Sequence, residues 1–314
     1  MEKFKIGVAG AGTMGASIAE TFAKFGHEVY LYDIFPEALV RAENLIKLNL
    51  ETEVSEGLLT HEQVEVLLSK ITYGTEVEKF DDTKLLIEAI LEKIEVKHEF
   101  WSKVSNIVAP DAILASNTSG LSITKIAEVV KNPERFAGMH WINPPHIIPL
   151  IEVISGKETK HETAQFIYDV CDYLGKKPVM IKDAPGFALN RIQFAIMREC
   201  LHIVNEGIAS IEDTDKVMKY ALGLRYAAFG PFEVADLGGL DIFYNISSYL
   251  FEDLADEKNV FGKLEDAFKG GNYGVKSGKG FYDYSDGKDQ EQIRYRDEMY
   301  TKIAKLLFDE NNHK

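Results

Sequence analysis

The stretch that decides the fold runs from residue 4 to residue 33 and reads FKIGVAGAGTMGASIAETFAKFGHEVYLYD. Residues 4–9 are a short apolar run of the kind that forms a buried strand. A glycine-rich segment, 10–15, separates them from helical periodicity over 17–25, and a second apolar run follows at 28–33. A strand, a helix and a strand in about thirty residues form a βαβ unit, which predicts a parallel sheet.

The rest of the chain divides into two halves of different character. The first half carries further strand-like segments, with helical patterns between most of them, at 85–87, 112–115, 136–140, 150–154 and 178–181. We therefore predict an α/β domain over residues 1–182 with a Rossmann-like, doubly wound sheet. From Asp183 onward the patterns are helical, beginning with an amphipathic segment at 187–206, and only 280–284 resembles a strand. We predict an all-α C-terminal domain over residues 183–314.

Composition excludes several classes of protein. The chain has 314 residues, of which 46% are hydrophobic and 27% charged, a globular balance that argues against disorder. The formal charge of −15 disfavours a nucleic-acid partner. No apolar run reaches the ~18–20 residues that a membrane span needs. The two cysteines, Cys171 and Cys200, fit neither a disulfide framework nor a zinc site, so we expect a cytoplasmic protein without a metal.

The glycine-rich segment Gly10-Ala-Gly-Thr-Met-Gly15 has the spacing of a dinucleotide-binding turn. In such a turn, Gly12 lets the backbone approach a pyrophosphate, and the helix that follows offers N–H groups to the phosphates. Asp33 ends the next strand, where a carboxylate can bind both ribose hydroxyls. A 2′-phosphate would face that charge, and residues 34–36 supply no arginine to receive it. We therefore predict NAD rather than NADP, with a glycine-rich turn that binds nothing as the alternative.

A histidine with a carboxylate partner is the best candidate for acid–base chemistry. His140 ends an apolar strand and is followed by WINPP at 141–145. Ligands in open α/β sheets lie beyond the carboxyl ends of strands, which favours His140 as a base, with His146 as a nearby alternative. Glu152 stands inside the apolar run 150–154, where a carboxylate is costly unless it is paired. We predict that it orients His140.

Two further polar sites stand where a ligand could reach them. The motif Ser116-Asn-Thr-Ser119 follows the strand at 112–115, so it either faces a ligand or caps the next helix. Asn190 lies in the first turns of the helix after the domain junction, where it is either a surface residue or a residue of an interdomain cleft.

Taken together, these features resemble the L-3-hydroxyacyl-CoA dehydrogenase family, including its bacterial 3-hydroxybutyryl-CoA members. The resemblance covers nearly the whole chain through the motifs GAGTMG (10–15), IEAILEK (87–93), ASNTSGLSI (115–123), GMHWINPP (138–145), LIEVI (150–154), PGFALNR (185–191) and KSGKGFYDY (276–284). It implies an N-terminal Rossmann domain and a helical C-terminal domain through which the family forms homodimers. It also implies a small-molecule substrate.

The resemblance also implies roles for particular residues. It makes His140 the catalytic base, with Glu152 as its orienting carboxylate. It places Ser119 and Asn190 at the substrate oxygen. It places Glu88 and Lys93 near the nicotinamide ribose. The full set of residues predicted to bind the cofactor is Gly10, Gly12, Thr13, Met14, Gly15, Asp33, Glu88, Lys93 and Asn117.

Two departures leave the substrate open. Family members that act on CoA thioesters carry lysines after the second strand, whereas residues 48–69 contain five glutamates and no lysine or arginine. The segments 223–231 and 143–153 are more similar to the branch with L-gulonate 3-dehydrogenase and lambda-crystallin. In that branch Arg225 would pair with a free substrate carboxylate, for which a guanidinium is well shaped. The alternative for Arg225 is a structural ion pair.

Two rival functions are kept beside the dehydrogenase prediction. Dehydrogenases similar to the 6-phosphogluconate enzyme use a lysine on the interdomain helix, and no lysine occurs between Asp183 and Asp215. A crystallin-like protein that binds NAD without turnover is the non-enzymatic rival. The complete set of Ser119, His140, Glu152 and Asn190 argues against it.

Overall fold

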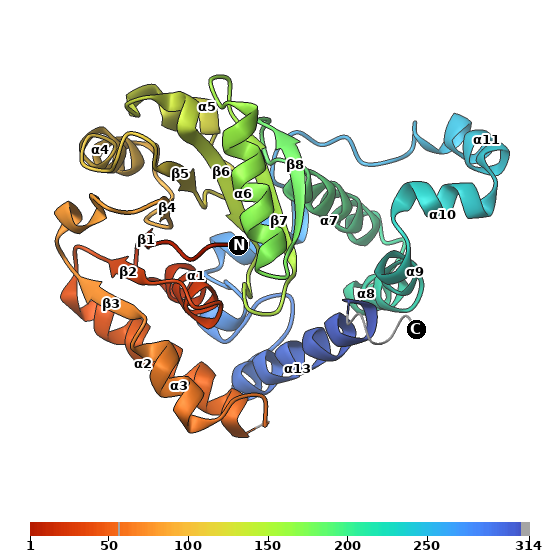
Figure 1. The fold of residues 1–314 in the computed structure, drawn as a ribbon. Coiled ribbons are helices and arrows are strands. Elements are labelled where there is room, and N and C mark those ends of the chain that lie inside the picture. Colours follow the sequence, from red (N-terminus) through yellow and green to blue (C-terminus); the bar gives the residue numbers. More distant parts are fainter. Residues whose placement is uncertain (56, 309–314) are drawn as a thin grey trace. The chain divides into compact units, whose positions relative to one another are not determined.

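The computed structural model describes residues 1–55 and 57–308. It divides the chain into two compact units, Met1–Asn190 and Arg191–Lys314 (Figure 1). The predicted fold class, a Rossmann-like sheet domain followed by an all-α domain, is confirmed.

The first unit is built on one eight-stranded sheet with the order β3-β2-β1-β4-β5-β6-β7-β8. The strands are β1 (Ile6–Ala9), β2 (Val29–Tyr32), β3 (Ile71–Gly74), β4 (Leu85–Glu88), β5 (Ile113–Ser116), β6 (Phe136–Trp141), β7 (Leu150–Ser155) and β8 (Lys177–Lys182). Neighbours are parallel from β3 to β6. β7 then runs antiparallel to β6, and β8 is parallel to β7. The chain therefore reverses direction immediately after β6.

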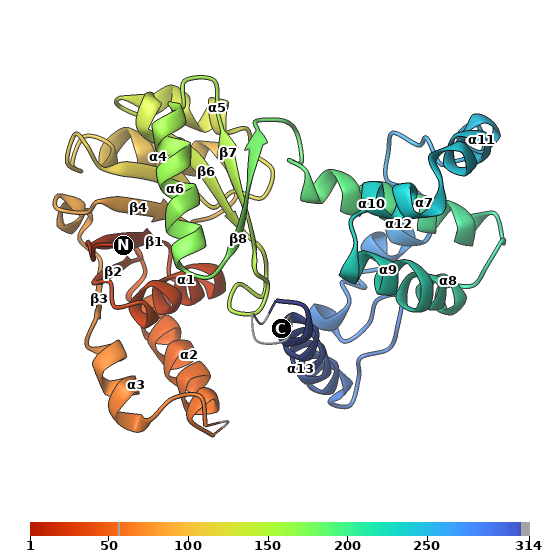
Figure 2. The same cartoon turned by 45° about the vertical axis from the view of Figure 1, so that its right-hand side comes forward.

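Helices cover both faces of this sheet (Figures 1 and 2). One face packs against α1 (Thr13–Lys24), α2 (Pro36–Ser55), α3 (His61–Leu68) and α6 (His161–Tyr173). The other packs against α4 (Ile94–Val104) and α5 (Ile123–Ile126). Because side chains alternate along a strand, Leu85 and Ile87 belong to the first core and Leu86 to the second. Each such fully buried side chain contributes about 1.5–3 kcal/mol relative to exposure.

Two glycines shape the turn between β1 and α1 for different reasons. Gly10 has a φ of +102°, a conformation that other residues rarely adopt. A Cβ on Gly15 would overlap the carbonyl oxygen of Gly10, so only glycine lets α1 pack this closely. Gly12, the N-cap of α1, is different, because no atom apart from its immediate chain neighbours and the nearby backbone of α1 lies within 4 Å of the position that a Cβ would take. That open space lies in front of the first turn of the helix.

Buried charges attach α2 to α1. Glu20 on α1 is 1% exposed, and its two oxygens accept hydrogen bonds from Lys24 (2.6 Å) and Asn49 (2.8 Å). Lys24 also donates to Glu53 near the end of α2 (2.5 Å). Burial disfavours the charged form of Lys24, but Glu20 and Glu53 more than offset this, so its pKa is raised. One of the glutamates between residues 48 and 69 thus has a structural role.

Among its described residues, the second unit has helices and no β-strand. Its helices are α7 (Leu189–Asn205, which starts in the first unit), α8 (Ile211–Val217), a π-helical turn (Met218–Leu222), α9 (Gly223–Ala228), α10 (Pro231–Gly238), α11 (Leu240–Leu250), α12 (Gly262–Lys269) and α13 (Lys288–Phe308). Ser210 caps α8, because its hydroxyl accepts from the Asp213 N–H at 3.1 Å. The possible strand at 280–284 is wrong: this region forms only isolated bridges. No described helix is both long and apolar enough to cross a membrane.

The glycine turn yields a matched pair of stability predictions. Gly15→Ala should lower the free energy of unfolding by about 1–3 kcal/mol, because its methyl group meets backbone that cannot yield. Gly12→Ala should change it by less than about 1 kcal/mol, because its site is open and its φ is negative. Urea unfolding followed by fluorescence would measure both, since the two tryptophans, Trp101 and Trp141, lie in the first unit. Equal stability of the two variants would contradict this account.

Candidate active site

A histidine and a glutamate face each other across the antiparallel pair of strands. His140 on β6 and Glu152 on β7 are direct cross-strand partners. Side chains of such partners lie on the same face of a sheet. The imidazole Nδ1 is 2.8 Å from Glu152 Oε2, and the two residues are only 4% and 1% exposed. The predicted pair is thus brought together inside the sheet, at the point where the chain reverses.

The second carboxylate oxygen of Glu152 is bound as well. It accepts the backbone N–H groups of Ala188 (3.0 Å) and Leu189 (2.9 Å) at the start of α7. Burial alone would raise the pKa of Glu152, but the hydrogen bonds from His140 and from these two N–H groups hold it below its usual range. Glu152 is therefore an anion at neutral pH and is fixed from both sides.

The motif Ser116–Ser119 leaves β5 toward this region. The Asn117 side chain accepts the N–H of Trp141 at 2.8 Å, which joins the motif to the residue after His140. Ser116 is buried, and its hydroxyl donates to Glu88 at 2.8 Å. The motif does not cap the next helix, because the N-cap of α5 is Ser122. The capping alternative for this motif is wrong.

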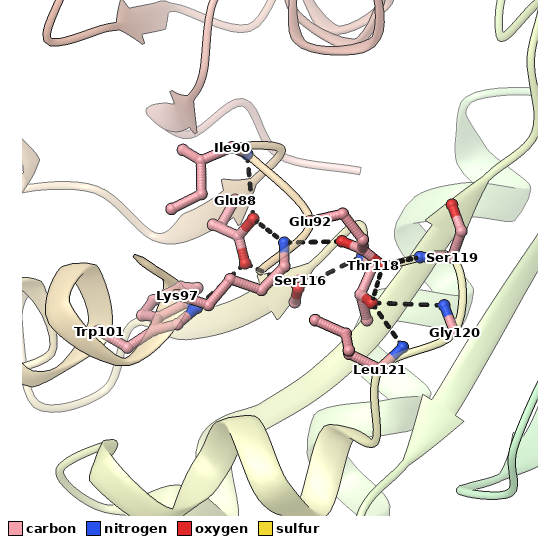
Figure 3. Close-up of polar contacts among 10 residues, drawn as sticks. All are labelled: Glu88, Ile90, Glu92, Lys97, Trp101, Ser116, Thr118, Ser119, Gly120 and Leu121. Atoms are coloured by element: carbon pink, nitrogen blue, oxygen red, sulfur yellow. Dashed lines mark hydrogen bonds and ion pairs between the residues drawn. The ribbon is translucent and has the colours of Figure 1, made fainter. Parts of the chain in front are cut away.

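A buried ion pair lies beneath the motif (Figure 3). Glu88 is wholly buried and 2.5 Å from the Nζ of Lys97, itself 1% exposed. The Glu88 carboxylate also accepts hydrogen bonds from the backbone N–H of Ile90 (3.0 Å), the indole N–H of Trp101 (3.3 Å) and the Ser116 hydroxyl. Buried charges persist only when they are paired and hydrogen-bonded, and this pair is both.

Glu92 links that ion pair to the end of the motif (Figure 3). It lies 3.1 Å from Lys97 and accepts both the Thr118 hydroxyl (2.5 Å) and the Ser119 N–H (2.9 Å). Burial raises the pKa of Glu92, yet the Thr118 hydrogen bond and the Lys97 charge leave it lowered overall. The side chain of Ser119 points away from this network in Figure 3. The network therefore fixes the Ser119 backbone and leaves its hydroxyl available.

Asn190 reaches the same loop from α7. Its Nδ2 donates to the carbonyl of Ser119 at 2.6 Å, so these two predicted site residues are brought together. Lys93 is exposed at the N-cap of α4. Arg225 is exposed on α9 in the second unit, and none of the described carboxylates forms an ion pair with it. The structural alternative for Arg225 thus finds no partner among residues 1–55 and 57–308.

A cavity of about 890 Å³ opens at the glycine turn of the first unit. Its lining includes Gly10, Gly12, Thr13 and Asp33. The Asp33 carboxylate accepts the N–H groups of Ala11 (2.8 Å) and Phe35 (3.0 Å), and each of its oxygens keeps a lone pair for a hydroxyl. With the open space at Gly12, these residues fit the predicted dinucleotide.

Other predicted cofactor residues lie elsewhere. Met14 packs against the core, Gly15 is buried, and Glu88 is enclosed by the partners described above. Roles for Glu88 and Lys93 beside the nicotinamide ribose stay predictions.

Sequence reasoning missed several residues that shape these sites. Lys97 is the residue that the sequence could have identified, because it lies on the buried face of α4, one helical turn before Trp101. A lysine at an apolar position of a helix was the signal that a buried carboxylate partner existed. The cavity also uses side chains that were not singled out: Tyr32, Arg41, Val96, Phe100 and Lys103.

Comparison with known proteins agrees with this architecture. The model for the NAD-binding domain of 3-hydroxyacyl-CoA dehydrogenase matches residues 5–184, and the model for its C-terminal domain matches 186–284. A probable 3-hydroxybutyryl-CoA dehydrogenase of Bacillus subtilis is 39% identical over 287 residues, covering 91% of this chain and 99% of its own. A 5-formyl-3-hydroxy-2-methylpyridine 4-carboxylate 5-dehydrogenase of Mesorhizobium japonicum is 36% identical, covering 89% of this chain and 90% of its own.

Solved structures give the same result. A crystal structure of a 5-formyl-3-hydroxy-2-methylpyridine 4-carboxylic acid 5-dehydrogenase, described as an NAD⁺-dependent dismutase, has a TM-score of 0.89 at 31% identity. It covers 98% of this chain and 99% of its own. The (S)-3-hydroxybutyryl-CoA dehydrogenase of Ralstonia eutropha has a TM-score of 0.77 at 33% identity, with coverage of 91% and 100%. The chain therefore belongs to the 3-hydroxyacyl-CoA dehydrogenase family and is an NAD-dependent oxidoreductase.

Proposed function

We propose that this enzyme interconverts the hydroxyl of an L-3-hydroxyacyl substrate, such as 3-hydroxybutyryl-CoA, and the corresponding 3-oxo group, with His140 as the general base and acid. The observation that carries the proposal is the buried contact between His140 Nδ1 and Glu152. Alcohol oxidation removes a proton and a hydride, and a histidine can take the proton near neutral pH. NAD, when bound, accepts the hydride.

Glu152 sets the chemistry of the imidazole. Since Nδ1 faces the carboxylate at 2.8 Å, it carries the hydrogen, and Nε2 is left to accept the substrate proton. The positive charge that the ring gains is stabilised by the Glu152 anion beside it. The backbone N–H groups of Ala188 and Leu189 prevent this carboxylate from turning away. Glu152 is thus proposed to orient the ring and stabilise its charged form.

Ser119 and Asn190 are proposed to hold the substrate oxygen. Support comes from the Asn190–Ser119 hydrogen bond and from Glu92, which binds the Ser119 N–H. These two hydrogen bonds hold the backbone of Ser119. Its hydroxyl takes part in neither of them and can donate to the substrate oxygen that becomes the carbonyl oxygen. Gly12 and Asp33 are proposed to bind the NAD pyrophosphate and ribose, respectively, as the open turn and the remaining lone pairs allow.

A second candidate substrate is a free 3-hydroxy acid whose carboxylate pairs with Arg225. The CoA phosphates would meet exposed glutamates on α2 and α3, among them Glu51, Glu62 and Glu65. Like charges at that surface disfavour a polyanionic substrate. The relative that gives a TM-score of 0.89 over nearly the whole chain is named for a pyridine carboxylate rather than a thioester.

We also propose a homodimer that forms through the second unit. Helices α10 and α11 carry large apolar side chains that are exposed in the single chain, among them Phe232 (86%), Tyr244 (74%) and Leu237 (72%). Exposed apolar surface of this kind usually marks an interface. Light scattering of the purified protein should give about twice the chain mass of 35.3 kDa, and a monomer at micromolar concentration would contradict the dimer.

The catalytic assignment predicts a loss of turnover in two variants. His140→Ala should lower kcat by about 10²–10⁴-fold, the usual contribution of a general base. Glu152→Gln should lower it by a similar factor, because the amide oxygen accepts the Ala188 and Leu189 N–H groups and the NH₂ group then donates to Nδ1, which leaves the ring hydrogen on Nε2. Affinity for NADH, measured by fluorescence titration, should stay within about twofold in both variants. The exposed His61→Ala serves as the matched control. A fully active His140→Ala enzyme would end the assignment.

The two substrate classes are separated by initial rates with NADH. The first proposal expects a kcat/KM for acetoacetyl-CoA at least about tenfold above that for acetoacetate, with Arg225→Met close to wild type. The second expects the reverse order, and Arg225→Met should raise the KM of the free acid about 10–100-fold, which is the cost of a lost charged hydrogen bond. If Arg225→Met leaves the KM of a preferred free acid unchanged, the second candidate is rejected.

A further inference from the structure

A buried lysine lies beside the strands that carry the candidate base, and the function proposed so far does not use it. Lys176 follows the C-terminus of α6, where Gly175 adopts a φ of +69°. The Gly175 N–H bonds to the Asp172 carbonyl (2.9 Å) and the Lys176 N–H to the Cys171 carbonyl (3.0 Å). These two bonds form the Schellman motif that ends many helices. They fix the Lys176 backbone, and only 7% of the residue is exposed.

The ammonium of Lys176 has no carboxylate partner among the described residues. Its Nζ donates to the carbonyl oxygens of Pro145 (2.6 Å) and Ile148 (3.2 Å). It also lies 5.4 Å from the centre of the Trp141 ring, within the range of a cation–π contact. Burying an ammonium without an anion is costly, and burial lowers the pKa of Lys176 to about 8. The free-energy cost of burying this ammonium indicates that the charge itself has a role, one that a neutral side chain would not fill.

The hydrogen bonds of the Lys176 ammonium converge on a single loop. Residues 142–149 connect β6, which carries His140, to β7, which carries Glu152. The adjacent Lys177 N–H binds the Pro149 carbonyl at 2.9 Å, so the start of β8 holds the end of the same loop. The loop must reverse the chain in the one register that places the imidazole opposite the carboxylate.

We propose that Lys176 is a positioning residue that holds the loop 142–149 through its charge and thereby keeps His140 aligned with Glu152. The inference rests on the proposed function only for its catalytic consequence, since the contacts themselves do not depend on it. The titratable groups that act on Lys176 are Cys171 on α6 and Lys24 on α1. His146 is the titratable side chain of the loop itself. Loss of the proton from Lys176 should loosen the loop.

The test compares Lys176→Met, which keeps the length of the side chain, with Lys176→Arg, which keeps its charge. Hydrogen exchange of the intact protein follows the amides of Ile147 and Ile148, which bond to the Pro144 carbonyl. Kinetics with NADH and either acetoacetyl-CoA or acetoacetate give kcat. In Lys176→Met, the hydrogen-exchange protection of these amides and kcat should each fall at least tenfold relative to wild type, while the affinity for NADH stays within twofold. Lys176→Arg should recover most of both.

The pH profile adds a readout that a merely structural role would not move. The profile is taken between pH 6 and 10 with NAD and the corresponding 3-hydroxy substrates, because His140 then accepts the proton and its own deprotonation cannot slow the reaction. Wild-type kcat should fall as the pH rises through about 8. This fall should be absent in Lys176→Met and should persist in His146→Gln. Unchanged kcat in Lys176→Met, with or without loss of protection, overturns the positioning role. If the wild type reduces neither substrate while Lys176→Met still loses protection, the proposed function fails and the loop contact stands.

Discussion

The antiparallel pairing of β6 with β7 is the constraint on which the site depends. In a sheet that is otherwise parallel from β3 to β6, this pairing places two polar side chains directly opposite each other in the core. A slip of one residue would turn every side chain of β7 to the other face, and Glu152 would be buried without a partner. The hydrogen bond between His140 and Glu152 therefore specifies the register of two strands whose side chains are buried on both faces.

Buried charge is concentrated around the loops that leave this part of the sheet. Glu88 with Lys97 lies below the motif Ser116–Ser119, and Glu152 is bound to the start of α7. Ion pairs of this kind seldom add net stability, because desolvation costs about as much as the attraction returns. Their value here is geometric. Glu88 binds the backbone N–H of Ile90 just after β4, and Glu152 binds those of Ala188 and Leu189 at the start of α7.

Much of this arrangement could be predicted from sequence because it follows from local rules. The βαβ unit, the glycine turn and Asp33 are set by contacts within about thirty residues. β3 was missed, because its four residues include only one buried side chain, Ile71, and so show little apolar pattern. The reversal after β6 was missed as well, since a buried strand reads the same in either direction.

The polar network below Ser119 lay beyond sequence reasoning for a different reason. Glu92 and Ser119 are far apart in the chain, and only the folded sheet brings β4 and β5 together. Lys97 carried a usable signal in its apolar helical position. Lys176 carried none, because its partners are backbone carbonyls, which every sequence contains.

We infer that this chain transfers hydride between NAD and the third carbon of an acyl substrate. The most direct measurement uses NADH deuterated at the transferable C4 position with acetoacetyl-CoA and with acetoacetate, followed by mass spectrometry of the products. We expect a 3-hydroxy product from at least one substrate, heavier by one deuterium at C3, with NAD formed in equal amount. A product without deuterium, or no 3-hydroxy product from either compound, would contradict this inference.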